Sequence, residues 1–296
     1  MALYVLKFGG SSVATTARIR KSAEIVANVR NRGHLVAVVT SAMQGVTNQL
    51  IDVAKAFCDS FVNREYDAII SSGEQVAAGL FALCLGSIGI SAKSMLGWQI
   101  PIRTSGFFSQ GFISSVNKDV ILNEILTNGT TPVIAGFQGI SDENEIMTIG
   151  RGGSDATACA VSCAIGADEC FIYTDVDGVY TADPRVVLNS KRLTQISYDE
   201  MLVLASLGAK VLQDKSVCIA KQCGVKLRVL SSFSEGGETI VTNETTYQND
   251  RKIAGIAHNT SVCIINISGD FNGSELTERL YFNKINLEFI SFFNQN

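Results

Sequence analysis

Short apolar runs alternate with longer stretches of helical periodicity along most of this 296-residue chain. The apolar runs, which predict buried strands, lie at residues 3–8, 35–39, 131–135, 169–173 and 226–230. The stretches that predict helices lie at 14–31, 72–85, 156–164, 198–207 and 211–223. Strands that alternate with helices are typical of a mostly parallel sheet with helices on both faces. We therefore expect an α/β fold arranged as a three-layer αβα sandwich.

Several predicted strands end in a loop of glycine and hydroxyl residues that leads into a helix. The first two of these loops contain Lys7, Phe8, Gly9 and Gly10, and then Ser41 and Thr47. Open α/β sheets bind ligands at the carboxyl ends of their strands, and backbone N–H groups in such loops can hold phosphate. The glycine spacing matches neither a P-loop nor a dinucleotide-binding motif. Lys7 either faces a bound anion or extends its ammonium to solvent.

A glycine turn at residues 151–155 (Arg-Gly-Gly-Ser-Asp) follows an apolar run and precedes a predicted helix. The pattern predicts Ser154 or Asp155 as the N-cap of that helix. A helix start offers unpaired N–H groups and the positive end of a dipole, and Arg151 can hold a carboxylate or phosphate through two parallel hydrogen bonds. The turn therefore suits an anion. The alternative is an ordinary tight turn with a solvated arginine.

Two further stretches carry candidate binding residues. Residues 174–185 follow a predicted strand and are dense in hydroxyls and carboxylates, with Tyr180 as a flat surface for a base and Arg185 as a phosphate partner. A calcium loop is the competing interpretation, but the spacing lacks the glutamate that such a loop needs. Glu74 lies in the first turn of a predicted helix, where it either complements the helix dipole or receives a substrate ammonium.

Composition narrows the classes of function. The chain is 46% hydrophobic and 18% charged, and its formal charge is −4 without a long basic run, which argues against nucleic acid as the main partner. The N-terminus shows no signal-peptide pattern, and no uninterrupted apolar stretch reaches the roughly 18 residues that a membrane span requires. We expect no membrane partner and a cytoplasmic location.

The eight cysteines lie mostly inside apolar periodic stretches, and no pair has zinc-ligand spacing with histidines nearby. Cys84, Cys159, Cys163 and Cys218 illustrate this placement. We interpret them as small buried hydrophobic residues in a reducing compartment, with metal or disulfide use as the lesser possibility.

Four separated motifs together resemble the aspartokinases, which belong to the amino acid kinase fold family. They are residues 7–13 (Lys-Phe-Gly-Gly-Ser-Ser-Val), 72–74 (Ser-Gly-Glu), 150–155 (Gly-Arg-Gly-Gly-Ser-Asp) and 174–185 (Thr-Asp-Val-Asp-Gly-Val-Tyr-Thr-Ala-Asp-Pro-Arg). The resemblance covers residues 1–235. It implies an ATP- and Mg²⁺-dependent kinase that converts L-aspartate to 4-phospho-L-aspartate, the first step toward lysine or diaminopimelate, threonine and methionine.

The resemblance also implies roles for individual residues, without naming metal ligands. The residues implied in catalysis are Lys7, Glu74 and Asp155. Those implied in aspartate binding are Ser41, Thr47, Glu74, Arg151, Gly152, Gly153 and Ser154. Those implied in ATP binding are Lys7, Phe8, Gly9, Gly10, Tyr173, Thr174, Asp175, Val179, Tyr180, Asp183, Pro184, Arg185 and Lys210. A carboxylate kinase resembling glutamate 5-kinase and a non-catalytic amino-acid-binding subunit are the alternatives.

The chain departs from the family pattern in three places. The loop at residues 107–115 lacks the acidic residue often found in that region. Gln213 and Asp214 replace the His-Pro pair common after Lys210. Residues 236–296 resemble a linker and the opening of an ACT regulatory domain, with strands at 262–267 and 285–289, whereas aspartokinases usually carry two ACT domains. We therefore expect a catalytic domain at 1–235, an incomplete ACT-like segment at 236–296, weakened feedback inhibition, and a homo-oligomer or pairing with an ACT-containing chain.

Overall fold

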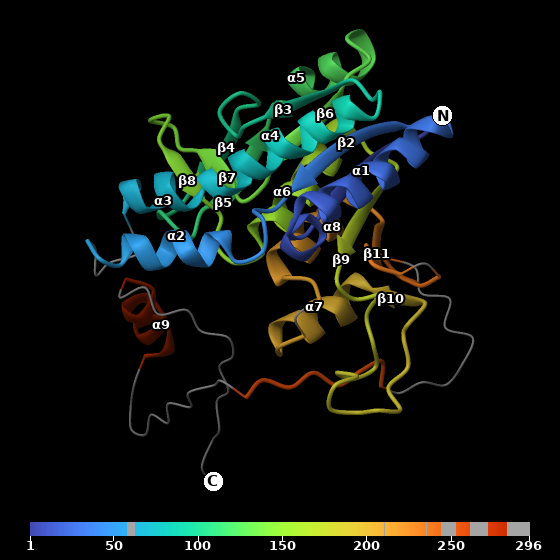
Figure 1. Ribbon diagram of the computed structural model, residues 1–296. Coiled ribbons are helices and arrows are strands. Elements are labelled where there is room, and N and C mark those ends of the chain that lie inside the picture. The colour runs from blue at the N-terminus through green and yellow to red at the C-terminus, as the bar shows by residue number, and fades with distance from the viewer. Residues whose placement is uncertain (58–62, 210, 235, 244–252, 261–271, 283–296) are drawn as a thin grey trace.

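The computed structural model describes residues 1–57, 63–209, 211–234, 236–243, 253–260 and 272–282. Its centre is an eight-stranded sheet in the order β10-β12-β11-β9-β1-β2-β6-β3 (Figure 1). These strands are β1 (Leu3–Phe8), β2 (Leu35–Thr40), β3 (Ala92–Met95), β6 (Thr131–Ala135), β9 (Glu169–Thr174), β10 (Gln195–Ser197), β11 (Leu227–Ser231) and β12 (Glu238–Thr242). Every neighbouring pair runs parallel except β11 with β12, so the expected mostly parallel sheet is confirmed.

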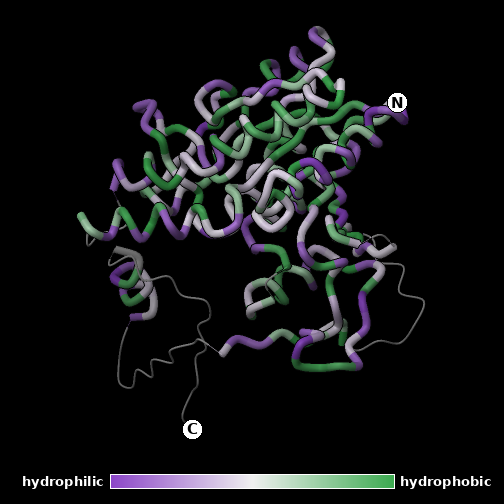
Figure 2. Tube along the Cα trace, viewed as in Figure 1, coloured by the Kyte–Doolittle hydropathy of each residue, from purple (hydrophilic) through white to green (hydrophobic). Residues whose placement is uncertain are grey.

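Side chains of the central strands alternate between two hydrophobic cores, one on each face of the sheet. On β1, Val5 packs into one core and Leu6 into the other. The core that contains Leu6 is covered by α1 (Thr16–Asn31) and α4 (Ser72–Ser87). The core that contains Val5 is covered by α5 (Lys118–Leu122), α6 (Gly153–Ile165), α7 (Tyr198–Ser206) and α8 (Asp214–Cys223). Apolar residues run through the centre of the fold (Figure 2), and the αβα sandwich is confirmed.

A second sheet of four strands lies beside the main one, in the order β5-β4-β7-β8. Its strands are β4 (Ile102–Ser105), β5 (Phe112–Val116), β7 (Gln138–Ile140) and β8 (Ile146–Thr148). The helices α2 (Val46–Ala54) and α3 (Arg64–Ile70) complete this end of the molecule (Figure 1). The sequence pattern did not predict β5 or β7, because β5 is mostly exposed without clear alternation and β7, although buried, has only three residues.

The interpretation of the cysteines as small buried hydrophobic residues was wrong for Cys163, Cys218 and Cys223. Cys163, near the end of α6, forms a disulfide with Cys223, the last residue of α8. Both are exposed, and their Cα atoms lie 5.7 Å apart because the two helices end side by side. Cys218 is also exposed, whereas Cys159 is buried as expected. Disulfides are uncommon in reducing compartments, so the predicted cytoplasmic location stays a prediction.

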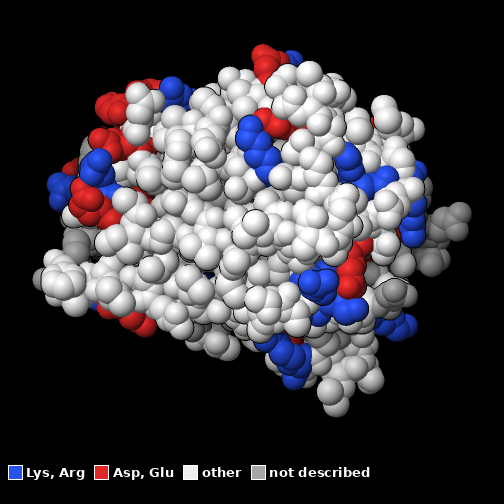
Figure 3. All heavy atoms as spheres, turned by 45° about the horizontal axis from the view of Figure 1, so that its top comes forward, with Lys and Arg blue, Asp and Glu red and all other residues white. Residues whose placement is uncertain are grey.

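One helical stretch among the described residues, 64–87, is long and apolar enough by composition to cross a membrane. It comprises α3 and α4, and α4 packs its buried residues, Phe81 and Leu85 among them, against the main sheet. We therefore interpret the stretch as core helices. On the face shown in Figure 3, charges of both signs are scattered around a largely uncharged centre without a continuous basic patch.

The predicted boundary at residues 235/236 stays a prediction. Strand β12 lies beyond it and pairs with β11 in the main sheet. The helix α9 (Gly273–Phe282) falls within the ACT-like segment. The two strands predicted there, at 262–267 and 285–289, lie outside the described residues.

Candidate active site

A cavity of about 230 Å³ opens at the carboxyl ends of the central strands. Its lining comes from loops and helix starts far apart in the sequence: Lys7, Ser41, Thr47, Glu74, Phe137, Gly150, Arg151, Gly152, Gly153, Ser154 and Asp155. Parallel strands bring their carboxyl ends to one edge of the sheet, which explains how these loops meet. The structure thus gathers two cations and two carboxylates in one cavity.

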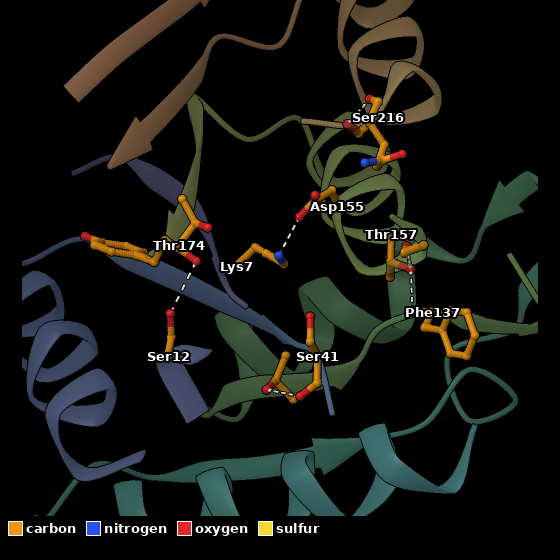
Figure 4. Close-up of polar contacts among 12 residues, drawn as sticks. Lys7, Ser12, Ser41, Phe137, Asp155, Thr157, Thr174 and Ser216 are labelled. Atoms are coloured by element: carbon orange, nitrogen blue, oxygen red, sulfur yellow. Dashed lines mark hydrogen bonds and ion pairs between the residues drawn. The ribbon is translucent and has the colours of Figure 1, made fainter. Parts of the chain in front are cut away.

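Lys7 reaches this cavity because of its position on β1. It points to the same face of the sheet as Val5, toward α6, and its side chain is almost fully buried. Its Nζ lies 2.5 Å from Oδ1 of Asp155, in the first turn of α6 (Figure 4). A buried ammonium is costly unless it is paired, so the ion pair with Asp155 offsets the cost of burying Lys7 beside the cavity.

Glu74 is the second buried carboxylate of the cavity and is only 4% exposed. Its Oε1 accepts a hydrogen bond from the backbone N–H of Ala42 at 3.0 Å, while its Oε2 is buried without a partner among the described residues. Burial raises the pKa of Glu74 to about 7, although backbone hydrogen bonds oppose the shift. An acceptor left open in this way suits a cationic group of a ligand.

The glycine turn begins the helix α6 earlier than the sequence predicted. The N-cap is Gly152, and both Ser154 and Asp155 lie inside the helix, so the predicted N-cap was wrong. Gly152 has a φ of +73°, in the left-handed region that glycine enters without steric cost. The lack of a side chain at Gly152 also leaves room for Gln213. A Cβ at this position would lie only 2.1 Å from the Cγ of Gln213.

Arg151 projects from the same turn. It is exposed, it lines the cavity, and it has no hydrogen bond or ion pair among the described residues. Its guanidinium is therefore available to a ligand.

Phe137 and Gly150 line the cavity but were not among the predicted site residues. Phe137 follows β6 with a φ of +69°, unusual for a residue with a side chain, and its N–H donates to Oγ1 of Thr157 at 3.2 Å (Figure 4). The segment 136–139 (Gly-Phe-Gln-Gly) after a buried strand was the available signal, because it repeats the pattern of the first two loops.

Lys7 lines the cavity, whereas the other described residues predicted to bind nucleotide lie beside it and do not line it. The backbone N–H of Gly9 donates to the carbonyl of Tyr173 at 3.0 Å, so the first glycine loop adjoins the start of the loop 174–185. Within that loop, the hydroxyl of Tyr180 donates to Asp177 at 3.0 Å. Arg185 pairs with Asp183 through two hydrogen bonds, which lower the pKa of Asp183 to about 2.

Three predicted nucleotide residues have side chains in the core. Phe8 is fully buried and stacks on Tyr173 with ring centroids 4.9 Å apart, and Val179 is 2% exposed. Their side chains are therefore packed in the core and are closed to a ligand. Thr174 and Asp175 lie at the end of β9, where Oγ1 of Thr174 donates to Asp175 at 3.1 Å. Lys210 lies outside the described residues.

Comparison with known proteins agrees with this geometry. The family model described as the amino acid kinase family matches residues 2–231. The chain belongs to the amino acid kinase family. The aspartate kinase of Stutzerimonas stutzeri is 46% identical over 270 residues, and that of Pseudomonas putida is 47% identical over 270 residues. Each alignment covers 91% of the chain, which spans only 65% and 66% of the two relatives.

Solved structures of the amino acid kinase family include close matches to this fold. The structure of E. coli aspartokinase III in complex with aspartate and ADP has a TM-score of 0.75 and 28% identity, and the match covers 83% of this chain and 65% of that one. The aspartate kinase of Synechocystis has a TM-score of 0.70 and 40% identity, covering 82% and 40%. The predicted resemblance to aspartokinases is confirmed.

Proposed function

We propose that this chain is an aspartate kinase, which transfers the γ-phosphoryl group of ATP to the β-carboxylate of L-aspartate and forms 4-phospho-L-aspartate. The observation that carries the proposal is the cavity shared by Lys7, Glu74 and Arg151. The relatives named aspartate kinase and the aspartokinase structure with aspartate and ADP support it. By the same reasoning, the product enters the route to lysine or diaminopimelate, threonine and methionine.

The charges of the cavity match those of a free α-amino acid. The unpaired guanidinium of Arg151 suits the α-carboxylate, which a planar fork can hold through two hydrogen bonds. The open Oε2 of Glu74 suits the ammonium. The hydroxyls of Ser41, Thr47 and Ser154 and the backbone of Gly152 and Gly153 complete the lining.

Phosphoryl transfer to a carboxylate needs no general base, because the nucleophile is already ionised at neutral pH. Neither histidine, His34 or His258, lines the cavity. The difficulty is to bring two anions together, and fixed positive charge meets it. Lys7 supplies that charge where the phosphoryl group is transferred, and Asp155 orients its ammonium at 2.5 Å. By resemblance, the backbone of Gly9 and Gly10 also approaches the phosphoryl group, and the N–H of Gly9 would then exchange its bond to the Tyr173 carbonyl for one to phosphate.

ATP binding is assigned to the loop that adjoins the cavity. Thr174, Asp175 and Tyr180 supply polar and aromatic groups for the nucleoside. The buried side chains of Phe8, Tyr173 and Val179 support this region from the core. By resemblance, Asp183 and Pro184 belong to the nucleotide pocket, and Arg185 and Lys210 contact the phosphates of ATP. Arg185 must exchange its bond with Asp183 for a bond to phosphate in this assignment.

Mg²⁺ is proposed to enter with the nucleotide. The described residues contain no group of three or more histidine, cysteine or acidic side chains placed to hold a metal, and Asp155 is already paired with Lys7. They therefore do not form a dedicated magnesium cage. Mg²⁺ commonly keeps several waters and binds through substrate phosphates, which this arrangement allows.

The proposal is tested by coupled ADP release with Mg²⁺ and ATP, comparing L-aspartate with L-glutamate, N-acetylglutamate and UMP. We expect turnover with L-aspartate to exceed that with every competitor. Faster turnover with L-glutamate would favour a kinase resembling glutamate 5-kinase, even though one methylene separates the substrates by only about 1–3 kcal/mol. Aspartate binding in calorimetry without any turnover would instead favour a non-catalytic binding subunit.

Oligomerisation and regulation form a separate part of the proposal. We propose a homo-oligomer or association with an ACT-containing chain, motivated by the ACT-like sequence at 236–296. Measuring the mass in solution, together with ADP release in the presence of lysine or threonine, tests it. A monomer whose activity neither amino acid changes would contradict this part alone.

A further inference from the structure

The glycine turn that carries Arg151 is held by three side chains from outside the cavity. Asp67 on α3 binds the residue Thr148 at the end of β8, Lys215 on α8 binds the carbonyl of Ile149, and Gln213 packs on Gly152. The backbone entering and leaving the turn is therefore held at three successive points. None of these three residues lines the cavity.

Asp67 provides the first of these contacts. It is fully buried, and its carboxylate accepts hydrogen bonds from the backbone and hydroxyl groups of both Thr148 and Ser109 at 2.6 to 3.0 Å. The carbonyl of Ser109 also lies against Gly150, 2.9 Å from where a Cβ would be. Asp67 thus fixes the strand end and the loop beside it, and burial raises its pKa against the effect of these bonds.

Lys215 provides the second of these contacts, and it differs from Asp67 because its ammonium brings a positive charge. Its Nζ donates to the carbonyl of Ile149 at 3.0 Å and lies 4.6 Å from the centre of the Phe112 ring. It is half-buried, and no carboxylate lies within ion-pair distance of it among the described residues. Burial lowers its pKa, while Asp214 opposes that shift.

A half-buried ammonium with only a carbonyl and a ring as partners carries a desolvation cost that an uncharged side chain would not. The charge has a use if an anion binds nearby. Lys215 lies at the back of Gly150, which lines the cavity: its Nζ is 3.9 Å from where a Cβ of that glycine would be. Figure 4 shows the start of α8, marked by Ser216, beside the helix from which Asp155 points to Lys7.

We propose that Lys215 is a positioning residue for Arg151 and adds positive charge to the side of the cavity that receives the substrate α-carboxylate. It acts through the Ile149 carbonyl, which sets the direction in which the backbone enters the turn. The proposal rests on the proposed aspartate kinase function. It assigns Lys215 to aspartate binding and not to the phosphoryl group, which Lys7 serves.

The test compares Lys215→Met, Lys215→Gln and Lys215→Arg in coupled ADP release and in calorimetry with aspartate. Lys215→Met should raise KM and Kd for aspartate roughly tenfold, the lower range expected for losing a charge-assisted hydrogen bond. Its kcat should stay within about twofold and its KM for ATP unchanged, because Lys7 and the nucleotide loop are untouched. Lys215→Arg should bind aspartate nearly as tightly as the wild type. Lys215→Gln should bind it with an affinity between those of the wild type and Lys215→Met, because glutamine keeps a hydrogen-bond donor without the charge.

The matched control is Lys221→Met on the same helix. Lys221 is exposed and pairs with Asp199, so its loss should leave all kinetic constants unchanged. An unchanged aspartate KM in Lys215→Met, with wild-type turnover intact, overturns this inference alone. A fall in Tm and kcat together with a rise in both KM values, without rescue by Lys215→Arg, overturns it in favour of a structural role. A wild type that neither binds nor phosphorylates aspartate overturns the proposed function as well.

Discussion

Lys7 and Asp155 form a buried ion pair, with Nζ and Oδ1 2.5 Å apart, between the central strand of the main sheet and the first turn of α6. The pair joins two elements separated by almost half of the chain. It places the ammonium in the same cavity as Arg151, which starts from the turn just before α6. The start of α6 therefore holds both cations of the cavity, to which the proposed function gives different roles.

Truncation of Lys7 and truncation of Arg151 should change different kinetic constants. Lys7→Ala should lower kcat on the order of 10²-fold or more with a smaller change in aspartate KM, because it removes charge needed mainly in the transition state. Arg151→Ala should chiefly raise aspartate KM, and Arg151→Lys should recover it poorly because the planar fork is lost. Steady-state kinetics measure both, and equal effects of the two alanine variants would contradict these roles.

Aspartate binding should depend on pH through Glu74, whose pKa burial raises to about 7. Only the ionised carboxylate attracts the substrate ammonium. Aspartate KM should therefore rise about tenfold from pH 8 to pH 6 and be nearly flat above pH 8. Glu74→Gln should bind aspartate weakly at every pH and lose this dependence. A wild-type KM that is constant between pH 6 and pH 8 would argue against ammonium binding by Glu74.

The folding stability of the protein should also depend on pH through Glu74. The pKa of Glu74 is higher in the folded protein than the ordinary 4.5, so the folded state binds more protons between pH 4.5 and about 7. The contribution of Glu74 to stability should accordingly fall as pH rises through this window. Glu74→Gln should raise Tm above pH 7 and change it little below pH 4.5, measured by thermal unfolding across pH. Equal changes in Tm at pH 4 and pH 8 would contradict the buried charge.

Gly152→Ala should destabilise the protein more than the strain of a left-handed backbone conformation alone explains. Its φ of +73° costs roughly 1–2 kcal/mol for a residue with a Cβ, and that Cβ would also collide with Gln213. Gly166→Ala is the matched control, because Gly166 has a φ of +64° but open space around it. Gly152→Ala should lower Tm more than the control and raise aspartate KM, and adding Gln213→Ala should recover part of both losses. Identical Tm values for the two alanine variants would show that Gln213 does not press on the turn.

The disulfide between Cys163 and Cys223 should stabilise the folded chain. It closes a loop with a sequence separation of 60, for which loss of chain entropy in the unfolded state predicts about 4 kcal/mol. A reductant or Cys163→Ser should lower Tm, whereas Cys218→Ser, which removes an exposed free thiol, should not. Peptide mapping with and without reductant identifies the bond. Equal Tm values with and without reductant would contradict a stabilising disulfide.

The sequence predicted most of the main sheet and its covering helices, because strands such as 131–135 and helices such as 14–31 carry strong local patterns. It also identified Lys7, Glu74 and Arg151 as candidates, since each stands in a glycine or hydroxyl loop at a strand end or helix start. It missed β5, whose mostly exposed residues do not alternate, and β7, which has only three residues. It also missed Phe137, whose position in the cavity depends on a left-handed backbone conformation.

By itself, the sequence determined which segments could bury an apolar face and which loops carried charge, because periodicity and glycine placement are local properties. Only the tertiary structure decided that the open oxygen of Glu74 lies in the same cavity as Arg151, that Gly152 caps α6, and that Cys163 meets Cys223. These relations depend on how strands pair and helices pack across long separations in the chain. No short window of sequence contains that information.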